Sequence, residues 1–235
     1  LILDDSQRWD FSNQHGYPTP TDEKIKSFLQ KSYDFRFPIS PANFTDTSVP
    51  AILSGMGSNQ DVLKLKGSLV FWDYFSKGVE TFFMSTQPLG WSRLDLFYQS
   101  IGQKHLWGAV AHSDFKGNPE TVDDRYVIKH FNEYLHDNNK KNIIGKNFVG
   151  VIQTFSSHYP YNSLPDVTAP YKPCDLTRST GVDSFKNCYL NGQIASAATK
   201  EQLLRSKTDK SYFSLAPPGR AGSLGTFSGL NPYVT

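Results

Sequence analysis

Three segments of the chain carry the apolar patterns of buried β-strands. Residues 1–3 are apolar and are followed at once by Asp4 and Asp5. Residues 78–87 and residues 146–155 are rich in β-branched and aromatic side chains, and each run leads into polar residues. The pattern predicts three strands, and the carboxyl ends of such strands are where α/β sheets keep their functional sites.

Other segments of the chain have apolar residues at helical spacing. This spacing predicts helices at residues 22–31, 48–54, 122–135 and 194–204, and the one at 122–135 is strongly amphipathic. Residues 162–187 are instead rich in turn-forming residues and predict a loop.

Strands that alternate with helices indicate an α/β protein. We predict a three-layer α/β/α sandwich with a mostly parallel sheet, formed by residues 1–235 as a single domain. The chain opens with what reads as the end of a buried strand. We therefore expect this domain to be incomplete at the amino terminus, and we consider the same for the carboxyl terminus.

Composition and charge narrow the class of protein. The chain has 38% hydrophobic and 14% aromatic residues, enough to bury a full core. Its net charge of +2 arises from 24 basic and 22 acidic residues that are interspersed, so no basic stripe indicates a nucleic-acid partner. No apolar run reaches the roughly 20 residues that a membrane span requires.

The two cysteines are Cys174 and Cys188, in a stretch that reads as a loop. They could close a small disulfide ring in an oxidising compartment or be unrelated buried thiols. They lack the CxxC spacing of a structural zinc site, so a metal centre built from them is not expected.

The start of the helix at 48–54 is the most informative position for chemistry. Thr45, Thr47 and Ser48 lie within one turn of it. Backbone N–H groups at a helix start have no partner within the helix, and the helix dipole is positive there, so a phosphate or an alkoxide is favoured. One of these hydroxyls could be a nucleophile, and the alternative is that Thr45 or Thr47 only caps the helix.

Taken in order, these segments resemble the alkaline phosphatase superfamily, in particular its sulfatase-like and phosphoethanolamine transferase members. The resemblance spans nearly the whole chain. It implies that Asp5, together with Asp4, binds a catalytic metal at the end of the first strand. Zinc is the favoured cation, with calcium, magnesium and manganese as alternatives, since carboxylate oxygens suit all four.

The same resemblance implies that Thr45 is the nucleophile and a further metal ligand. In this family the nucleophile lies ten residues before the glycine that ends its helix, and counting back from Gly55 reaches Thr45. The Ser48-Val49-Pro50 sequence that follows is similar to that of the transferases. A formylglycine sulfatase is disfavoured because threonine cannot be oxidised to that aldehyde.

Further site residues follow from the resemblance. His158, which precedes Tyr159 and Pro160, would contact the transferred group or a second metal, and the alternative is a capping or core histidine. Ser48, Arg8 and Gln153 are assigned to substrate binding. Gln153 stands five residues before His158, where the transferases usually have another histidine.

The resemblance also bears on partners and location. It favours a disulfide between Cys174 and Cys188, which indicates an extracytoplasmic domain, either periplasmic or secretory. A phospholipid or another phosphodiester is the implied substrate. The transferases that the chain resembles carry a membrane anchor, so membrane association would require a segment that is not in this sequence.

One departure leaves two functional hypotheses open. The family expects an Asp-His pair near the carboxyl end to complete the metal site, whereas Pro217-Pro218 stands there. The first hypothesis is a metal-dependent phosphotransferase or hydrolase that forms a phospho-threonine intermediate. The second is a catalytically inactive relative that serves as a binding or structural subunit.

Overall fold

The computed structural model describes ten segments of the chain, which are residues 2–4, 39–57, 59–75, 78–99, 105–111, 122–136, 147–161, 169–176, 181–205 and 227–228. The predicted helix at 22–31 lies outside these segments, as do Asp5, Arg8 and Pro217-Pro218.

A five-stranded sheet forms the centre of the described structure. Its strands follow the order β3-β2-β4-β1-β5, and neighbouring strands pair in parallel. The strands are β1 (Ile2–Asp4), β2 (Glu80–Ser85), β3 (His105–Gly108), β4 (Phe148–Gln153) and β5 (Phe227–Ser228). The predicted strands at 1–3, 78–87 and 146–155 are thereby confirmed as β1, β2 and β4.

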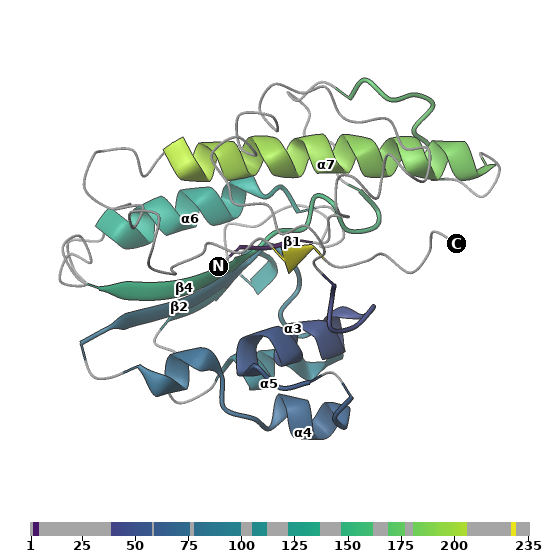
Figure 1. The fold of residues 1–235 in the computed structure, drawn as a ribbon. Helices are drawn as coiled ribbons and strands as arrows, with labels where there is room; N and C mark the ends of the chain where they lie inside the picture. Colours follow the sequence, from purple (N-terminus) through teal and green to yellow (C-terminus); the bar gives the residue numbers. More distant parts are fainter. Residues whose placement is uncertain are drawn as a thin grey trace, which may run out of the picture.

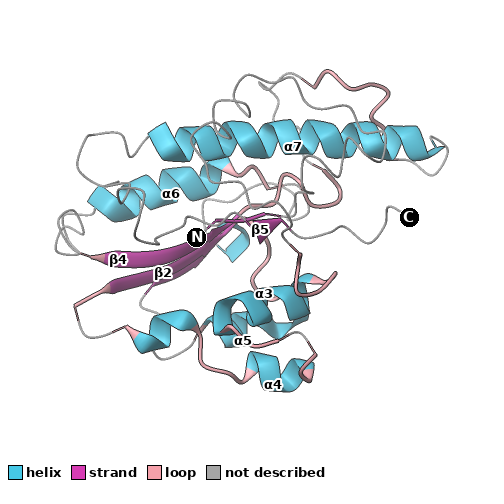
Figure 2. Ribbon diagram, viewed as in Figure 1, coloured by secondary structure: helices cyan, strands magenta, loops and turns pink. Residues whose placement is uncertain are grey.

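Helices follow the strands along the chain (Figure 2). They are α3 (Thr45–Ser54), α4 (Val62–Lys66), α5 (Leu94–Tyr98), α6 (Arg125–His136) and α7 (Gly181–Arg205), with short 3-10 turns η1 (Phe71–Tyr74), η2 (Trp91–Arg93) and η3 (Ala109–Ala111). In the segments described, no helix is long and apolar enough to cross a membrane.

The helices form two layers with the sheet between them. In Figure 1, α6 and α7 lie above the sheet, and α3, α4 and α5 lie below it. The side chains of β2 show the same division, because Phe82 and Met84 pack in one cluster with Phe131 of α6, while Phe83 packs in a second cluster with Leu53 of α3. Successive residues of a strand point to opposite faces, so β2 contributes to both cores. The predicted three-layer α/β/α sandwich is confirmed.

The helix at 194–204 was predicted too short. The structure has one 25-residue helix, α7, from Gly181 to Arg205. The predicted loop at 162–187 is therefore wrong over residues 181–187, as is the placement of Cys188 in a loop, whereas residues 169–176 form no helix or strand, as predicted. The reason for the longer helix is visible in the contacts of the polar residues in the first turns of α7. Ser184, Asn187 and Asn191 bind a neighbouring extended segment, and these bonds outweigh their weak helix propensity.

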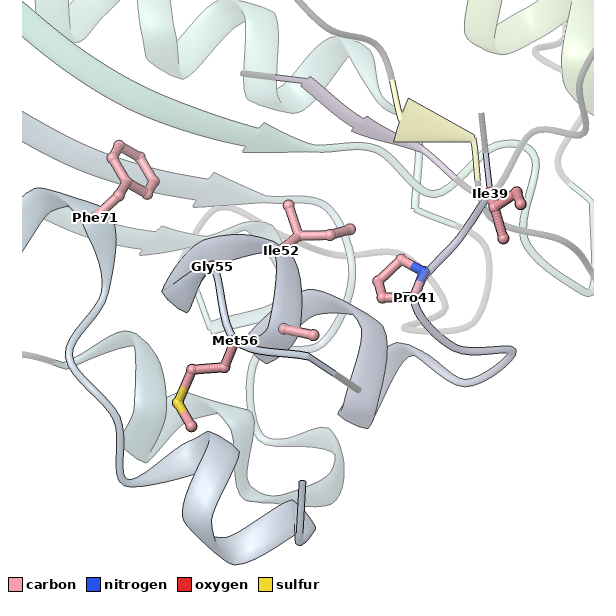
Figure 3. Close-up of a pocket in the computed structure, with 7 residues that line it drawn as sticks. Ile39, Pro41, Ile52, Gly55, Met56 and Phe71 are labelled. Atoms are coloured by element: carbon pink, nitrogen blue, oxygen red, sulfur yellow. The ribbon is translucent and has the colours of Figure 1, made fainter. Parts of the chain in front are cut away.

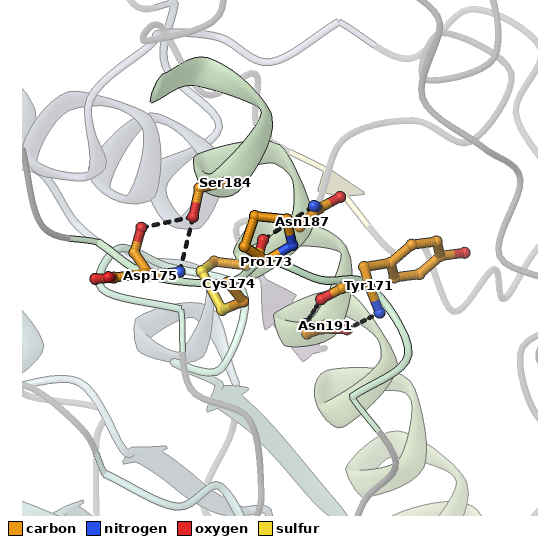
Figure 4. The surroundings of a disulfide bond; sticks show 8 residues. Tyr171, Pro173, Cys174, Asp175, Ser184, Asn187 and Asn191 are labelled. Carbon is orange, nitrogen blue, oxygen red and sulfur yellow. Dashed lines mark hydrogen bonds between the residues drawn. A yellow bond between two sulfur atoms is a disulfide. The ribbon is translucent and has the colours of Figure 1, made fainter. Parts of the chain in front are cut away.

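That extended segment, residues 171–175, runs along the first turns of α7 and is called the strap below (Figure 4). The side chain of Asn191 pairs with the backbone of Tyr171, and the hydroxyl of Ser184 pairs with the backbone of Asp175. Between these contacts, Cys174 forms a disulfide with Cys188 of α7. The predicted disulfide is confirmed.

Candidate active site

The carboxyl ends of β1, β2 and β4 meet at one edge of the sheet. Leu3 of β1 and Ser85 of β2 both pair in register with Gln153, the last residue of β4. Asp4, the last residue of β1, therefore lies beside the chain as it leaves β4. The first turn of α3 lies toward the same side (Figure 1). The carboxyl ends of these three strands and the first turn of α3 thus lie toward one end of the sandwich.

Thr45 is the first residue of α3. The residue before it, Phe44, occupies the N-cap position, and no side chain caps the helix. The N-cap alternative for Thr45 and Thr47 is therefore wrong. The backbone N–H groups of Thr47 and Ser48 donate to the carbonyl of Phe44, at 3.2 and 2.8 Å. Among the described residues, nothing bonds to the side chain of Thr45, which is partly buried.

The first turn of α3 is fixed by contacts of its neighbours. Asp46 accepts hydrogen bonds from the hydroxyls of Thr47 and Ser92, both at 3.3 Å. Lys66 in turn donates to the carbonyl of Ser92 at 2.6 Å. Ser92 and Arg93 have φ values of 50° and 59°, a left-handed conformation that is uncommon outside glycine. Backbone strain of this kind persists only where the surrounding structure imposes it.

Gln153 belongs to a buried network of amides and hydroxyls between β2 and β4. Its side-chain NH₂ donates to the side-chain carbonyl of Gln87 at 2.9 Å, and Gln87 donates to the carbonyl of Thr154 at 3.0 Å. Ser85 lies 3.4 Å from the amide oxygen of Gln153. Gln153 is 4% exposed, so its amide is engaged in joining the two strand ends. Its assignment to substrate binding stays a prediction.

His158 lies in the turn that follows β4. Its backbone N–H donates to the carbonyl of Phe155 at 2.9 Å, and its ring stacks on the Phe155 ring with centroids 5.1 Å apart. The ring nitrogen Nδ1 is within hydrogen-bond distance of the carbonyl of Tyr159. Because a carbonyl only accepts, Nδ1 carries the proton and Nε2 remains for other contacts.

A buried carboxylate holds the start of this turn. Asp124 precedes α6 and is fully buried, and it accepts hydrogen bonds from the backbone N–H groups of Phe155 and Ser156 and from the hydroxyl of Thr86. Burial raises the pKa of Asp124, and these hydrogen bonds act in the opposite direction. The sequence predicted an amphipathic helix opened by acidic residues here, without a role for Asp124 in the turn after β4.

Comparison with protein families identifies the family of this chain. Residues 1–193 match the family described as Sulfatase. The chain belongs to the sulfatase family. No curated protein matches it.

Several solved structures share the fold of this sulfatase-family chain. The integral membrane lipooligosaccharide phosphoethanolamine transferase A (EptA) of Neisseria meningitidis is 17% identical, with a TM-score of 0.65, over 88% of this chain and 38% of that one. The C-terminal periplasmic domain of EcEptC from Escherichia coli, in complex with Zn, is 14% identical, with a TM-score of 0.61, over 87% and 58%. A protein of the alkaline phosphatase superfamily from Vibrio parahaemolyticus is 16% identical, with a TM-score of 0.60, over 86% and 49%.

These similarities concern the fold and cover only part of each solved structure. Identities of 14–17% show a shared fold, and the chain spans 38–58% of the length of these three structures. The resemblance to the alkaline phosphatase superfamily, including phosphoethanolamine transferases, is confirmed.

The structure describes some of the predicted site residues of this sulfatase-family chain, and Asp5 and Arg8 lie outside the described segments. Thr45, Ser48, Gln153 and His158 are within the described segments, and Asp4 is described as the end of β1. The described segments contain no group of three or more His, Cys, Asp or Glu side chains placed to hold a metal ion. The metal and substrate roles assigned to these residues stay predictions.

An apolar cavity of about 460 Å³ lies beside α3 (Figure 3). Ile39 and Pro41, ahead of the helix, line it together with Ile52, Met56 and Phe71. None of the described residues that line it carries a titratable side chain.

Proposed function

We propose that residues 1–235 form one sulfatase-like domain of a metal-dependent phosphotransferase or hydrolase that acts on phosphodiesters through a phospho-threonine intermediate. The observation that carries the proposal is the position of Thr45. It is the first residue of α3, which begins on the side where β1, β2 and β4 end, in a chain of the sulfatase family.

The helix start supports Thr45 as the nucleophile. The positive end of the α3 dipole favours negative charge on the threonine oxygen and on a bound phosphate. Among the described residues, no hydrogen bond occupies the Thr45 side chain. In the proposed reaction the Thr45 oxygen bonds to phosphorus as the ester bond to the leaving alcohol breaks. An acceptor alcohol or water then releases the threonine.

His158 is proposed to exchange a proton with the transferred group or the leaving alcohol. Support comes from its hydrogen bond to Tyr159, which fixes the proton on Nδ1 and directs Nε2 toward other partners. Stacking on Phe155 limits rotation of the ring. An imidazole held in one tautomer and one orientation suits a general acid or base.

A divalent cation, most suitably zinc, is proposed to be held by Asp4, Asp5 and Thr45. The side chains of these residues are of a suitable type, because carboxylate and hydroxyl oxygens are ligands of zinc and of the harder divalent cations. The backbone of Asp4 lies beside the end of β4, at the same edge as the other candidate groups. When bound, the cation would stabilise negative charge on the phosphate and on the threonine oxygen.

A phosphoethanolamine-type headgroup is the proposed substrate class, with Ser48, Arg8 and Gln153 as binding residues. The similarity to a lipooligosaccharide phosphoethanolamine transferase and the match to the sulfatase family support this choice. An extracytoplasmic location is proposed as well, supported by the disulfide and by the likeness to a periplasmic domain.

Phosphodiester hydrolysis tests the proposal. The purified chain, supplied with zinc, should release nitrophenol from bis(p-nitrophenyl) phosphate. Thr45→Ala should lower the rate by about a thousandfold or more, as expected for removal of a nucleophile. Thr47→Ala, two residues further along α3, is the matched control and should retain the rate. Turnover that is equal in Thr45→Ala and wild type would exclude Thr45 as the nucleophile. Absence of both turnover and bound metal would favour the inactive relative.

A further inference from the structure

The turn that carries His158 is anchored by a buried carboxylate at its first two residues. One oxygen of Asp124 accepts from the backbone N–H of Phe155 at 2.7 Å, and the other accepts from the backbone N–H of Ser156 at 2.9 Å. Asp124 and Ser156 are both 0% exposed. Charge-assisted bonds of this kind, made away from water, are among the stronger hydrogen bonds in proteins.

Helix α7 packs against the same turn. Gly192 of α7 packs so closely that a Cβ atom there would lie 2.4 Å from the carbonyl oxygen of Ser156 and 3.5 Å from Cβ of Tyr161. Only glycine fits this approach without a shift of the backbone. Tyr189, one turn earlier on α7, packs its ring against that of Tyr161, with centroids 5.6 Å apart.

These two contacts act on His158 through the turn itself. Phe155, whose N–H is held by Asp124, accepts the hydrogen bond of the His158 backbone and carries the ring on which the imidazole stacks. Ser156 is held by Asp124 through its N–H and approached by Gly192 at its carbonyl. A displacement of either residue is therefore passed directly to the imidazole.

We propose that Asp124 and Gly192 are positioning residues, which together fix the turn after β4 so that His158 is held in place for the reaction. This inference rests on the proposed function, in which His158 meets the transferred group. Misplacement of a catalytic group by about 1 Å can lower a rate by about a hundredfold. Contacts from two parts of the chain, the residue just before α6 and helix α7, hold the turn with the precision that such a group needs.

Asp124→Asn is the first test, because it keeps the size of the side chain and changes only its bonding. An amide has one oxygen, so its NH₂ must face the N–H of Phe155 or that of Ser156. Asp123→Asn is the matched control. Asp123 is the adjacent carboxylate, and its described bonds go to Arg125. Gly192→Ala tests the contact between α7 and the turn, because the added Cβ atom would displace the carbonyl of Ser156.

Two readouts are measured on the whole chain. With bis(p-nitrophenyl) phosphate, Asp124→Asn and Gly192→Ala should lower kcat by about tenfold or more, with KM changed far less, and Asp123→Asn should match wild type. In NMR spectra of histidine side chains, the His158 ring signal, assigned by its absence in His158→Gln, should move in both test variants and stay in place in Asp123→Asn.

The spectroscopic readout separates this inference from the proposed function. If the wild-type chain shows no turnover, the proposed function fails, while the His158 signal still decides whether Asp124 and Gly192 position the ring. An unchanged His158 signal in folded Asp124→Asn and Gly192→Ala would overturn the inference. If Asp124→Asn does not fold, Gly192→Ala decides by the same measurements.

Discussion

The side chain of Asn191 satisfies both backbone polar groups of Tyr171, donating to its carbonyl at 2.9 Å and accepting from its N–H at 3.2 Å. Asn191 lies on α7, and Tyr171 begins the strap (Figure 4). The strap is therefore held by hydrogen bonds on either side of the disulfide.

Removal of the disulfide should lower stability without detaching the strap. Cys174 and Cys188 are 14 residues apart, and a cross-link that closes a loop of about that length stabilises by about 3 kcal/mol. The Cys174→Ala, Cys188→Ala double variant should show that loss in urea unfolding. Hydrogen exchange at Tyr171 should stay slow, because Asn191 still accepts from its N–H. An unchanged urea midpoint would count against a stabilising role of the bond.

Gly150 leaves room for an aromatic ring on the neighbouring strand. Gly150 of β4 pairs in register with Phe82 of β2, and a Cβ atom at Gly150 would meet the Phe82 ring at 2.0 Å. Gly150→Ala should therefore overpack the core and lower the free energy of unfolding by about 1–3 kcal/mol. Gly90→Ala is the control, because Gly90 is exposed and no atom of the described residues lies within 4 Å of the added carbon; it should change the free energy of unfolding by less than about 0.5 kcal/mol. Equal stability of the two variants would contradict the packing described.

Tyr134 should make stability fall at high pH. Burial, and to a smaller extent the negative charge of Glu80, raises the pKa of Tyr134 from 10.0 to about 12. The unfolded chain therefore ionises this tyrosine first, so its contribution is fully present below pH 10 and is lost as the pH rises from 10 toward 12. Wild type should lose more unfolding free energy than Tyr134→Phe over that interval in chemical denaturation. Parallel pH profiles for the two proteins would show that Tyr134 is not perturbed.

Metal removal should abolish turnover reversibly. If Asp4, Asp5 and Thr45 hold the cation, dialysis against a chelator should eliminate phosphodiester hydrolysis, and zinc should restore it. Elemental analysis should find about one tightly held zinc per chain, and Asp5→Asn should bind it more weakly. Full activity after exhaustive chelation would contradict the proposed metal dependence.

The strands were predictable because their signal is local. Most residues of β2 and the last three of β4 are buried, so nearly continuous apolar runs mark these strands, and the polar residues that follow mark where they end. The local pattern of hydroxyls at the start of an apolar helix left Thr45, Thr47 and Ser48 as candidates, and the family resemblance selected Thr45 among them. The structure added that Phe44, rather than a threonine, occupies the N-cap.

Features that depend on distant partners could not be predicted in the same way. The first turns of α7 read as a loop because Ser184, Asn187 and Asn191 favour turns, and their partners are 9 to 20 residues earlier in the chain. Asp124 looked like one of two acids at the start of a helix, and its partners Phe155 and Ser156 lie 31 and 32 residues later. Nothing local distinguishes it from Asp123.

Mass spectrometry of the covalent intermediate tests the central claim most directly. The chain is mixed with bis(p-nitrophenyl) phosphate in the presence of zinc, quenched in acid during turnover, and digested. The account predicts a phosphoryl-type adduct on Thr45, absent from Thr45→Ala and present in Thr47→Ala. Turnover with no adduct on Thr45, or with the adduct on another residue, would contradict it.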